Sequence, residues 1–480
     1  MFTAPCPGCG APLNFRSPAS VMAVCGYCQT TALRDAESVR DQGKISQVLD
    51  DLSPLQTGVT GQYEGRAFTL LGRLQMAYDS GRWSEWFAWF DDGTEGWLSE
   101  ASGQYVFTLR QPPVTNAPPF EGLKPGKLFY WQDQPFRASD VRTAQCTGGQ
   151  GELPFAVGKG WEAKTADFRV GAHFLTLDYS EGTPPVCYAG RAVTLDELNC
   201  QLLRDEEQIA RNTGQEKGKI QALDCPNCGS PIQAVTGMTA HLVCPSCHAD
   251  VDLNGDKATV LAIHEAVSAQ STLRLGEIGN FDGAAWTVIG FLKARESGEE
   301  DSVWTEYLLF NLKKGFSWLV ESDEGWETVA VLNEIPDILD DSRIRYQGQT
   351  LKREWTYGSE VTYAAGAFNW RIRVGDRSEI SDFKAANFKL TRESYQDEIT
   401  WSLARREPAA TVLGWFGREV PVAPRYNPVL KAPGELGSLF KIFSTLLWVI
   451  NLPLIVFGNG NLVVTLIAWG VLWIFNRTGD

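Results

Sequence analysis

The sequence predicts a mostly β protein in which two zinc ribbons alternate with two antiparallel β domains of sandwich or barrel type, followed by a transmembrane helical hairpin. Three observations predict this. Two sets of four cysteines share one internal spacing and lie 219 residues apart in the 480-residue chain. Each set is followed by aromatic and β-branched segments, separated by turn sequences at the spacing of short strands. Similar sequences recur in both halves, which indicates a tandem duplication.

Each cysteine set has the spacing C-x2-C, fifteen residues, C-x2-C, which is typical of a zinc ribbon. The candidate metal ligands are Cys6, Cys9, Cys25 and Cys28 in residues 1–33, and Cys225, Cys228, Cys244 and Cys247 in residues 223–252. Four thiolates close a tetrahedron around Zn²⁺ and leave no position for water, so we expect two structural zinc ions. Metal binding then supplies folding free energy on the order of 10 kcal/mol, which such small ribbons need. Iron, bound as in rubredoxin, is the alternative for the same ligands.

The two β domains are expected over 55–190 and 271–407. In the first, Phe68–Tyr78 and Trp83–Phe90 have strand composition, and the sequence Asp-Asp-Gly-Thr at 91–94 follows as a hairpin turn. The second domain repeats this order with its own glycine turns. Strands at such short intervals favour an antiparallel sandwich or barrel.

Helical segments are expected between these domains. A helical linker is predicted over 191–222, because Thr194 and Glu197 form a capping box and are followed by an apolar stripe. A further helix is predicted from Val39 to Leu52. Five prolines over 408–437 indicate a semi-extended tether.

Residues 438–476 predict the membrane hairpin. A run of twenty residues carries one charge, Lys441, and a second apolar run of fourteen follows a Gly/Asn turn. Twenty helical residues span about 30 Å, the thickness of a bilayer core. Basic residues flank the hairpin and the turn has none, so both ends are expected in the cytoplasm, at a bacterial inner membrane. The alternative is a buried helical pair in a soluble domain.

Charge and cysteine use narrow the function classes. The chain has a net charge of -15, and Arg16 is the one charged residue within 1–33. Ribbons so poor in cations are not expected to bind nucleic acid. Metal-type cysteine spacing, without a secretory signal sequence, predicts a reducing compartment.

A candidate ligand-binding site lies among the aromatic residues of the first β domain. Strand alternation places Trp83 and Glu85 on one face, and Trp97 and Glu100 follow on the next strand. If the two carboxylates converge in a cleft lined by the two indoles, a ligand site is favoured, and burial would raise their pKa. The alternatives are an aromatic core and a salt bridge at a strand edge.

Enzyme signatures are mostly missing from the sequence. It contains no G-x-S-x-G, no P-loop, no H-E-x-x-H and no G-x-G-x-x-G after a strand. We therefore assign no catalytic residues, and enzymatic activity stays open with a preference against it.

Several motifs of the first half follow its ribbon in a fixed order. They are Leu55-Gln56-Thr57-Gly58, Phe68-Thr69-Leu70-Leu71-Gly72-Arg73-Leu74-Gln75, Trp83-Ser84-Glu85-Trp86 and Gly96-Trp97-Leu98-Ser99-Glu100. With the ribbon, they resemble the bacterial family called domain of unknown function 4178 over 55–190. The second half resembles it less closely over 271–407, with Gly290-Phe291-Leu292-Lys293 in place of the Gly-Arg-Leu-Gln motif. The resemblance implies two tandem copies, no established activity, and a role linked to the envelope or to polyamines.

Together these observations predict a membrane-tethered cytoplasmic scaffold or adaptor that holds a protein partner, in envelope stress or polyamine-linked physiology. The alternative is an enzyme or a sensor for a small ligand, such as a polyamine-like cation, that uses an acidic aromatic cleft in the first β domain.

Overall fold

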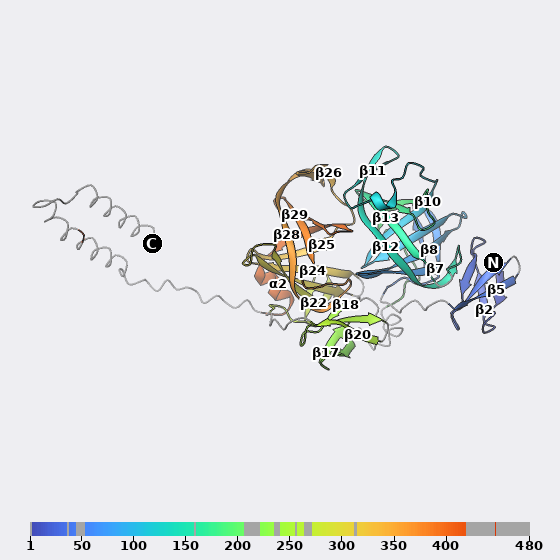
Figure 1. The fold of residues 1–480 in the computed structure, drawn as a ribbon, viewed down its shortest axis with the longest axis horizontal. Helices are drawn as coiled ribbons and strands as arrows, with labels where there is room; N and C mark the ends of the chain where they lie inside the picture. Colours follow the sequence, from blue (N-terminus) through green and yellow to red (C-terminus); the bar gives the residue numbers. More distant parts are fainter. Residues whose placement is uncertain are drawn as a thin grey trace, which may run out of the picture. The chain divides into compact units, whose positions relative to one another are not determined.

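The computed structural model describes residues 2–35, 38–44, 53–157, 160–205, 221–234, 241–254, 257–263, 271–311, 314–418 and 447. The chain divides into two units, Met1–Gly417 and Arg418–Asp480, and the first holds every strand named below (Figure 1). Nearly all of the predicted tether and hairpin lies outside the described residues. Within the described part of the chain, no helix is long and apolar enough to cross a membrane.

The first β domain is a closed barrel of eight antiparallel strands. Two meanders of four strands each are joined edge to edge, by β10 with β15 on one side and by β7 with β12 on the other. The strands are β7 (Arg66–Tyr78), β8 (Gly81–Phe90), β9 (Glu95–Ala101), β10 (Gln104–Gln111), β12 (Gln134–Leu153), β13 (Glu162–Val170), β14 (His173–Asp178) and β15 (Val186–Val193). Short additions are β6 (Thr60–Tyr63), β11 (Leu128–Trp131) and the 3-10 turn η1 (Phe120–Gly122).

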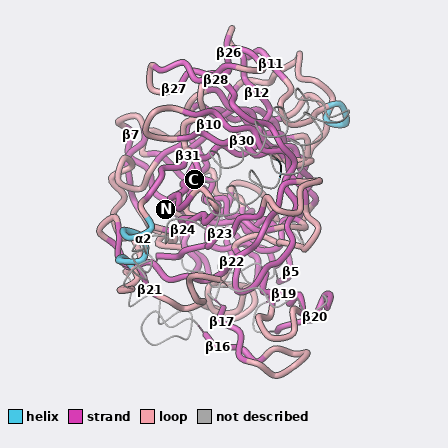
Figure 2. The backbone as a smooth tube through the Cα atoms, turned by 90° about the vertical axis from the view of Figure 1, so that its left-hand side faces the viewer, coloured by secondary structure: helices cyan, strands magenta, loops and turns pink. Residues whose placement is uncertain are grey.

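The second β domain repeats the eight barrel strands of the first. Its barrel closes through β25 with β31 and through β22 with β28. The strands are β22 (Ala284–Glu296), β23 (Val303–Asn311), β24 (Gly315–Ser322), β25 (Gly325–Val331), β28 (Gln349–Phe368), β29 (Arg377–Lys384), β30 (Lys389–Ser394) and β31 (Ile399–Glu407). The additions are β21 (Ile278–Phe281), β26 (Asp337–Asp340) and β27 (Arg343–Tyr346). Of the two predicted architectures, the barrel is therefore correct, and strands dominate the described chain (Figure 2).

Both barrels close along a seam, defined here as the pairing of β7 with β12 and of β22 with β28, and glycine permits the close approach there. A Cβ atom on Gly72 would lie 2.0 Å from the Glu152 carbonyl oxygen, and one on Gly290 would lie 2.5 Å from the Ala367 carbonyl oxygen. Real Cβ atoms do not approach a carbonyl so closely. The first strands of the two meanders of each barrel, β7 with β12 and β22 with β28, can meet here only because these two residues lack a side chain.

Each ribbon continues the sheet of its own barrel. Strand β3 pairs with the end of β12, and β18 pairs with the end of β28. The ribbon strands are β1 (Phe2–Pro5), β2 (Pro12–Phe15), β3 (Met22–Val24), β4 (Thr30–Asp35), β5 (Ser38–Lys44), β16 (Gln221–Asp224), β17 (Pro231–Ala234), β18 (His241–Val243), β19 (Ala249–Asn254) and β20 (Lys257–Ile263). The helix predicted from residue 39 is wrong in its described part, because β5 pairs there with β4.

Of the helical linker predicted over 191–222, residues 191–193 belong to β15 and residues 194–205 form turns, whereas residues 206–220 lie outside the described residues. The capping box exists: the Thr194 amide donates to Glu197 at 2.8 Å, and the Glu197 amide donates to the Thr194 hydroxyl at 3.2 Å. The chain then turns away, because Asn199 and Leu202 have φ of 48° and 61°. Leu198 is buried in a hydrophobic cluster with Phe68 and Trp86 of the first barrel.

The corresponding segment of the second barrel is the short helix α2 (Ala409–Trp415). Its residue Val412 and the following Phe416 are buried against the barrel, and Trp415 stacks on Phe281 at 4.5 Å between ring centroids. The predicted tether from residue 408 is thus corrected in its described part, because residues 409–415 form a helix that packs through Val412 and Leu413.

Candidate functional site

The first cysteine cluster forms where two hairpin turns meet. Cys6 and Cys9 lie after β1, and Cys25 and Cys28 lie after β3. The Sγ atoms of Cys6 and Cys28 are 3.6 Å apart, as are those of Cys9 and Cys25, and all four lie within 4.8 Å of one another. Four sulfurs at about 2.3 Å from a tetrahedral metal ion would lie about 3.8 Å apart. The cluster therefore has the dimensions of an S4 metal site.

The second cluster has the same geometry. Its Sγ–Sγ distances are 3.6 Å for Cys225 with Cys247 and 3.7 Å for Cys228 with Cys244. The Asn227 amide group donates to Cys247 Sγ at 3.4 Å, which helps to stabilise a thiolate. His241 is buried on β18, with Nε2 3.5 Å from Asp250, and is not part of the cluster. The prediction of two four-cysteine clusters able to hold metal ions is confirmed.

A second feature is a large cavity of about 2250 Å³ inside Met1–Gly417, lined by inward-facing residues of both barrels. Side chains alternate between the inside and the outside of a barrel strand, so one residue in two lines the interior. Seventeen aspartates and glutamates line this cavity, against ten lysines and arginines. The acidic character of the chain is therefore concentrated at this surface.

In the first barrel, Glu85 points into the cavity from β8. Its carboxylate accepts hydrogen bonds from Trp83 Nε1 at 2.7 Å and from Ser99 Oγ at 2.6 Å. Burial raises the pKa of Glu85 to about 7; these two hydrogen bonds oppose the shift, and the Asp167 and Asp178 carboxylates add to it. Among the described residues, no lysine or arginine forms an ion pair with Glu85, so the predicted alternative of a strand-edge salt bridge is wrong.

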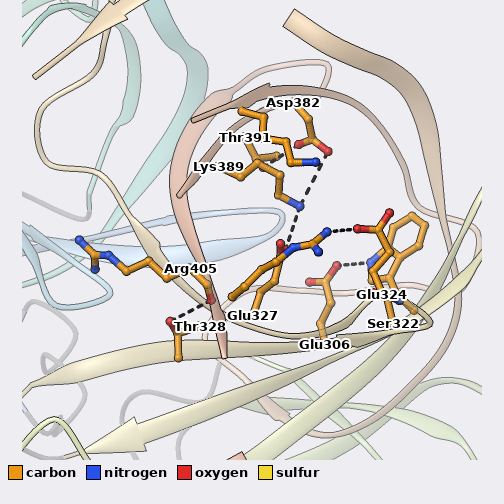
Figure 3. A network of polar contacts seen from close by, with 12 residues as sticks. Glu306, Ser322, Glu324, Glu327, Thr328, Asp382, Lys389, Thr391 and Arg405 are labelled. Atoms are coloured by element: carbon orange, nitrogen blue, oxygen red, sulfur yellow. Dashed lines mark hydrogen bonds and ion pairs between the residues drawn. The ribbon is translucent and has the colours of Figure 1, made fainter. Parts of the chain in front are cut away.

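Glu306 repeats this arrangement on β23 of the second barrel. Its carboxylate, labelled in Figure 3, accepts a hydrogen bond from Trp304 Nε1 at 2.7 Å. Burial raises the pKa of Glu306 to about 7, and the Glu393 carboxylate adds to the shift.

A second carboxylate recurs in both lumens. Asp167 on β13 accepts a hydrogen bond from Thr176 on the neighbouring strand at 2.5 Å, and Asp382 on β29 accepts one from Thr391 at 2.7 Å. In both barrels the aspartate and the threonine are direct partners across the two neighbouring strands. Burial raises the pKa of both aspartates. Two positions thus keep the same acid in both halves of the chain.

The second lumen also contains a partly buried cation, Lys389 on β30. Its Nζ lies 2.8 Å from Glu327 and 3.8 Å from Asp382, as Figure 3 shows. Burial alone lowers the pKa of an ammonium group, but the Asp382 and Glu327 carboxylates outweigh burial here and raise the pKa of Lys389.

The structure brings together three of the four predicted ligand-binding residues. Trp83, Glu85 and Trp97 line the cavity. Glu100 does not, because β9 turns it to the outer face, where it accepts hydrogen bonds from Trp86 Nε1 at 2.9 Å and Ser53 Oγ at 2.8 Å.

Asp167 takes the place beside Glu85 that the sequence analysis assigned to Glu100. Sequence reasoning did not select it, although the repeat of Asp167-Phe168 as Asp382-Phe383 was visible. It also missed Lys389, for which the sequence carries no signal.

Comparison with known proteins identifies both barrels. The profile of the family described as domain of unknown function (DUF4178) matches residues 56–195 and 274–409, which is more than half of the chain. No curated protein and no solved structure matches the chain. The chain therefore belongs to the DUF4178 family and carries two tandem copies of its domain, each built as an eight-stranded barrel.

Proposed function

We propose that this protein is a non-catalytic binding protein whose first barrel takes a small organic cation into its lumen. The observation that supports this most directly is Glu85, a partly buried carboxylate beside Trp83 inside a closed barrel, without an ion pair to any described residue. Burying a carboxylate without a counter-charge is costly, and a cationic ligand would offset that cost.

The other lining residues fit the same ligand class. Eight-stranded barrels have room for one small ligand. Trp97 and Trp161 both contact Phe155, with ring centroids 6.0 Å and 5.5 Å from that of Phe155. All three rings line the cavity and supply faces for the ligand's charged or apolar part. A polyamine-like cation, the ligand suggested by the family resemblance, has both parts.

The test is calorimetric titration of the full-length protein with 1,4-diaminobutane. The variant Glu85→Gln is expected to weaken binding at least tenfold, because it removes the charge and keeps the shape. Glu100→Gln is the matched control on the outer face, and it should leave affinity unchanged. If wild type binds no diamine, or if both variants bind as wild type does, the proposal is wrong.

We further propose that both four-cysteine clusters hold zinc with a structural role. The donors are four sulfurs at tetrahedral spacing, a set that suits zinc and also iron. Elemental analysis of the purified protein is expected to give two equivalents of zinc per chain. Two equivalents of iron would overturn the assignment of zinc. One equivalent of metal, or none, would overturn the proposal that both clusters hold a metal ion.

The scaffold function remains a second proposal, supported by the apolar runs within 438–476. In this proposal, the segment anchors the protein in a bacterial inner membrane, with the barrels in the cytoplasm, where they hold a protein partner. Deletion of 438–475 is expected to release the protein into the soluble fraction, and affinity capture with and without this segment would identify a partner. Continued membrane association of the deleted form would contradict the anchor.

A further inference from the structure

The two lumens differ at two neighbouring positions. The register that pairs Asp167 with Thr176 and Asp382 with Thr391 places Phe174 where the second barrel has Lys389. The same comparison can be made across strands β8, β9 and β10. Glu85 pairs with Ser99, which pairs with Val106. In the second barrel Glu306 pairs with Val320, which pairs with Glu327, so Val106 stands where the second barrel has Glu327. The first lumen therefore keeps the shared acids but lacks the lysine and its closest carboxylate.

Lys389 places an ammonium group between two carboxylates of the second lumen. Its four-carbon stem carries an ammonium group to the Asp382 carboxylate, which has an equivalent in the first barrel, and Glu327 holds it from the other side. An ammonium group on an alkyl chain is chemically a tethered primary amine. Figure 3 shows Lys389 between these two carboxylates, with Glu306 nearby.

We propose that Lys389 is a built-in occupant of the second lumen, and that the first lumen takes a free primary alkylammonium ion in its place. This inference rests on the proposed function and specifies its ligand class. One chain then binds one amine, at Glu85 and Asp167. Phe174 and Val106 offer apolar contact for the alkyl part.

The arginines of the first lumen do not fill this place. Arg142 is held by Asp140 and by Glu398, which lies 3.0 Å from it. Arg169 donates to the carbonyl oxygen of Asn333 at 2.5 Å, and its guanidinium lies over the Phe174 ring at 4.5 Å. Both charges reach Asp167 through space, but among the described residues neither forms an ion pair with it.

The chemistry of the resident lysine also predicts selectivity. A primary ammonium has three N–H donors, whereas a quaternary ammonium has none and is bulkier. Glu85 and Asp167 each have acceptor capacity beyond the hydrogen bonds described above. The first lumen should therefore prefer 1-aminobutane over tetramethylammonium by at least tenfold.

A reciprocal exchange between the barrels tests the proposal. Phe174→Lys with Val106→Glu builds the second pattern into the first barrel, and Lys389→Phe with Glu327→Val builds the first pattern into the second. The full-length forms are titrated calorimetrically with 1-aminobutane, with 1-butanol as the neutral control. We expect one equivalent bound by wild type, none by the first double variant and two by the second.

The outcomes separate the two proposals. If wild type binds no 1-aminobutane or diamine, the proposed function fails. If wild type binds one amine but the first double variant still binds one, or if tetramethylammonium binds equally well, this inference fails and the proposed function stands. Circular dichroism checks folding of each form; if the second double variant does not fold, the first double variant and the selectivity decide the question.

Discussion

The two barrels are alike at their seams and unlike in their lumens. The seam glycines Gly72 and Gly290 hold the same place against a carbonyl oxygen. Across the lumens, by contrast, Lys389 and Glu327 of the second barrel stand where the first has Phe174 and Val106, at equivalent register positions. Backbone closure tolerates no side chain at the seam, whereas lumen residues can change without disturbing the strands. The comparison shows that barrel closure constrains the seam residues, whereas the lumen residues have diverged between the two copies.

The largest expected effect comes from the seam. Gly72→Ala should destabilise the protein by about 3 kcal/mol or more, because its Cβ would meet the Glu152 carbonyl oxygen at 2.0 Å and the backbone would have to move. Gly290→Ala should cost somewhat less, since its nearest approach is 2.5 Å. Denaturant unfolding of the full-length protein measures both. Gly414→Ala, which meets no atom within 4 Å, is the open-space control; an equal loss there would remove the special role of the seam.

A smaller effect is expected where the ribbons differ. Glu152 of β12 accepts hydrogen bonds from the Arg16 amide at 2.6 Å and from Ser20 Oγ at 2.8 Å, and so holds the first ribbon. Ala367 stands opposite Leu242 at the corresponding seam of the second ribbon and, as an alanine, offers no side-chain acceptor. Glu152→Ala should cost about 2 kcal/mol, because it leaves buried donors without an acceptor. Limited proteolysis should then cut within 1–44 faster than within 221–263; equal rates would contradict this role.

The smallest effect concerns pH. The folded protein raises the pKa of Glu85 and Glu306 to about 7, so the folded state holds a proton that the unfolded state releases above about pH 4.5. Their contribution to stability is therefore fully present below pH 4.5 and is lost as pH rises through 7. Since the lumen admits water, we expect the loss to be about 1 kcal/mol per carboxyl.

The matched variants Glu85→Gln and Glu306→Gln check this dependence. In each variant, the unfolding free energy should fall by about 1 kcal/mol less than in wild type between about pH 5 and about pH 8. Amine binding to the first barrel should strengthen over the same range, as Glu85 loses its proton. A stability that rises with pH, and does so equally in the variants, would rule out the buried carboxyls as its cause.

Much of this architecture could be predicted from local sequence. Cysteine spacing is set by the shape of the hairpin turns, so Cys6 and its seven counterparts gather as expected. Internal repeats report on shared topology, and the capping box at Thr194 forms because it needs only four consecutive residues. Each of these signals depends on neighbours in sequence.

The remaining features depend on residues distant in sequence. Glu100 lies outside the barrel because strand pairing sets its face, and no motif reveals which face is the interior. Asp167 joins Glu85 only when the barrel closes. Lys389 is one lysine among many in the sequence, and its role becomes visible only when Glu327 and Asp382 are seen around it.

The pairing of β3 with β12 has a further consequence. Because the ribbon supplies the hydrogen-bonding neighbour for the end of that strand, unfolding of the ribbon after thiol oxidation would leave Glu152 and Leu153 as an uncovered edge. Uncovered edges of this kind recruit strands from other chains. Oxidative damage to a few sulfur atoms would then show itself as self-association of the protein, at a place remote from any ligand.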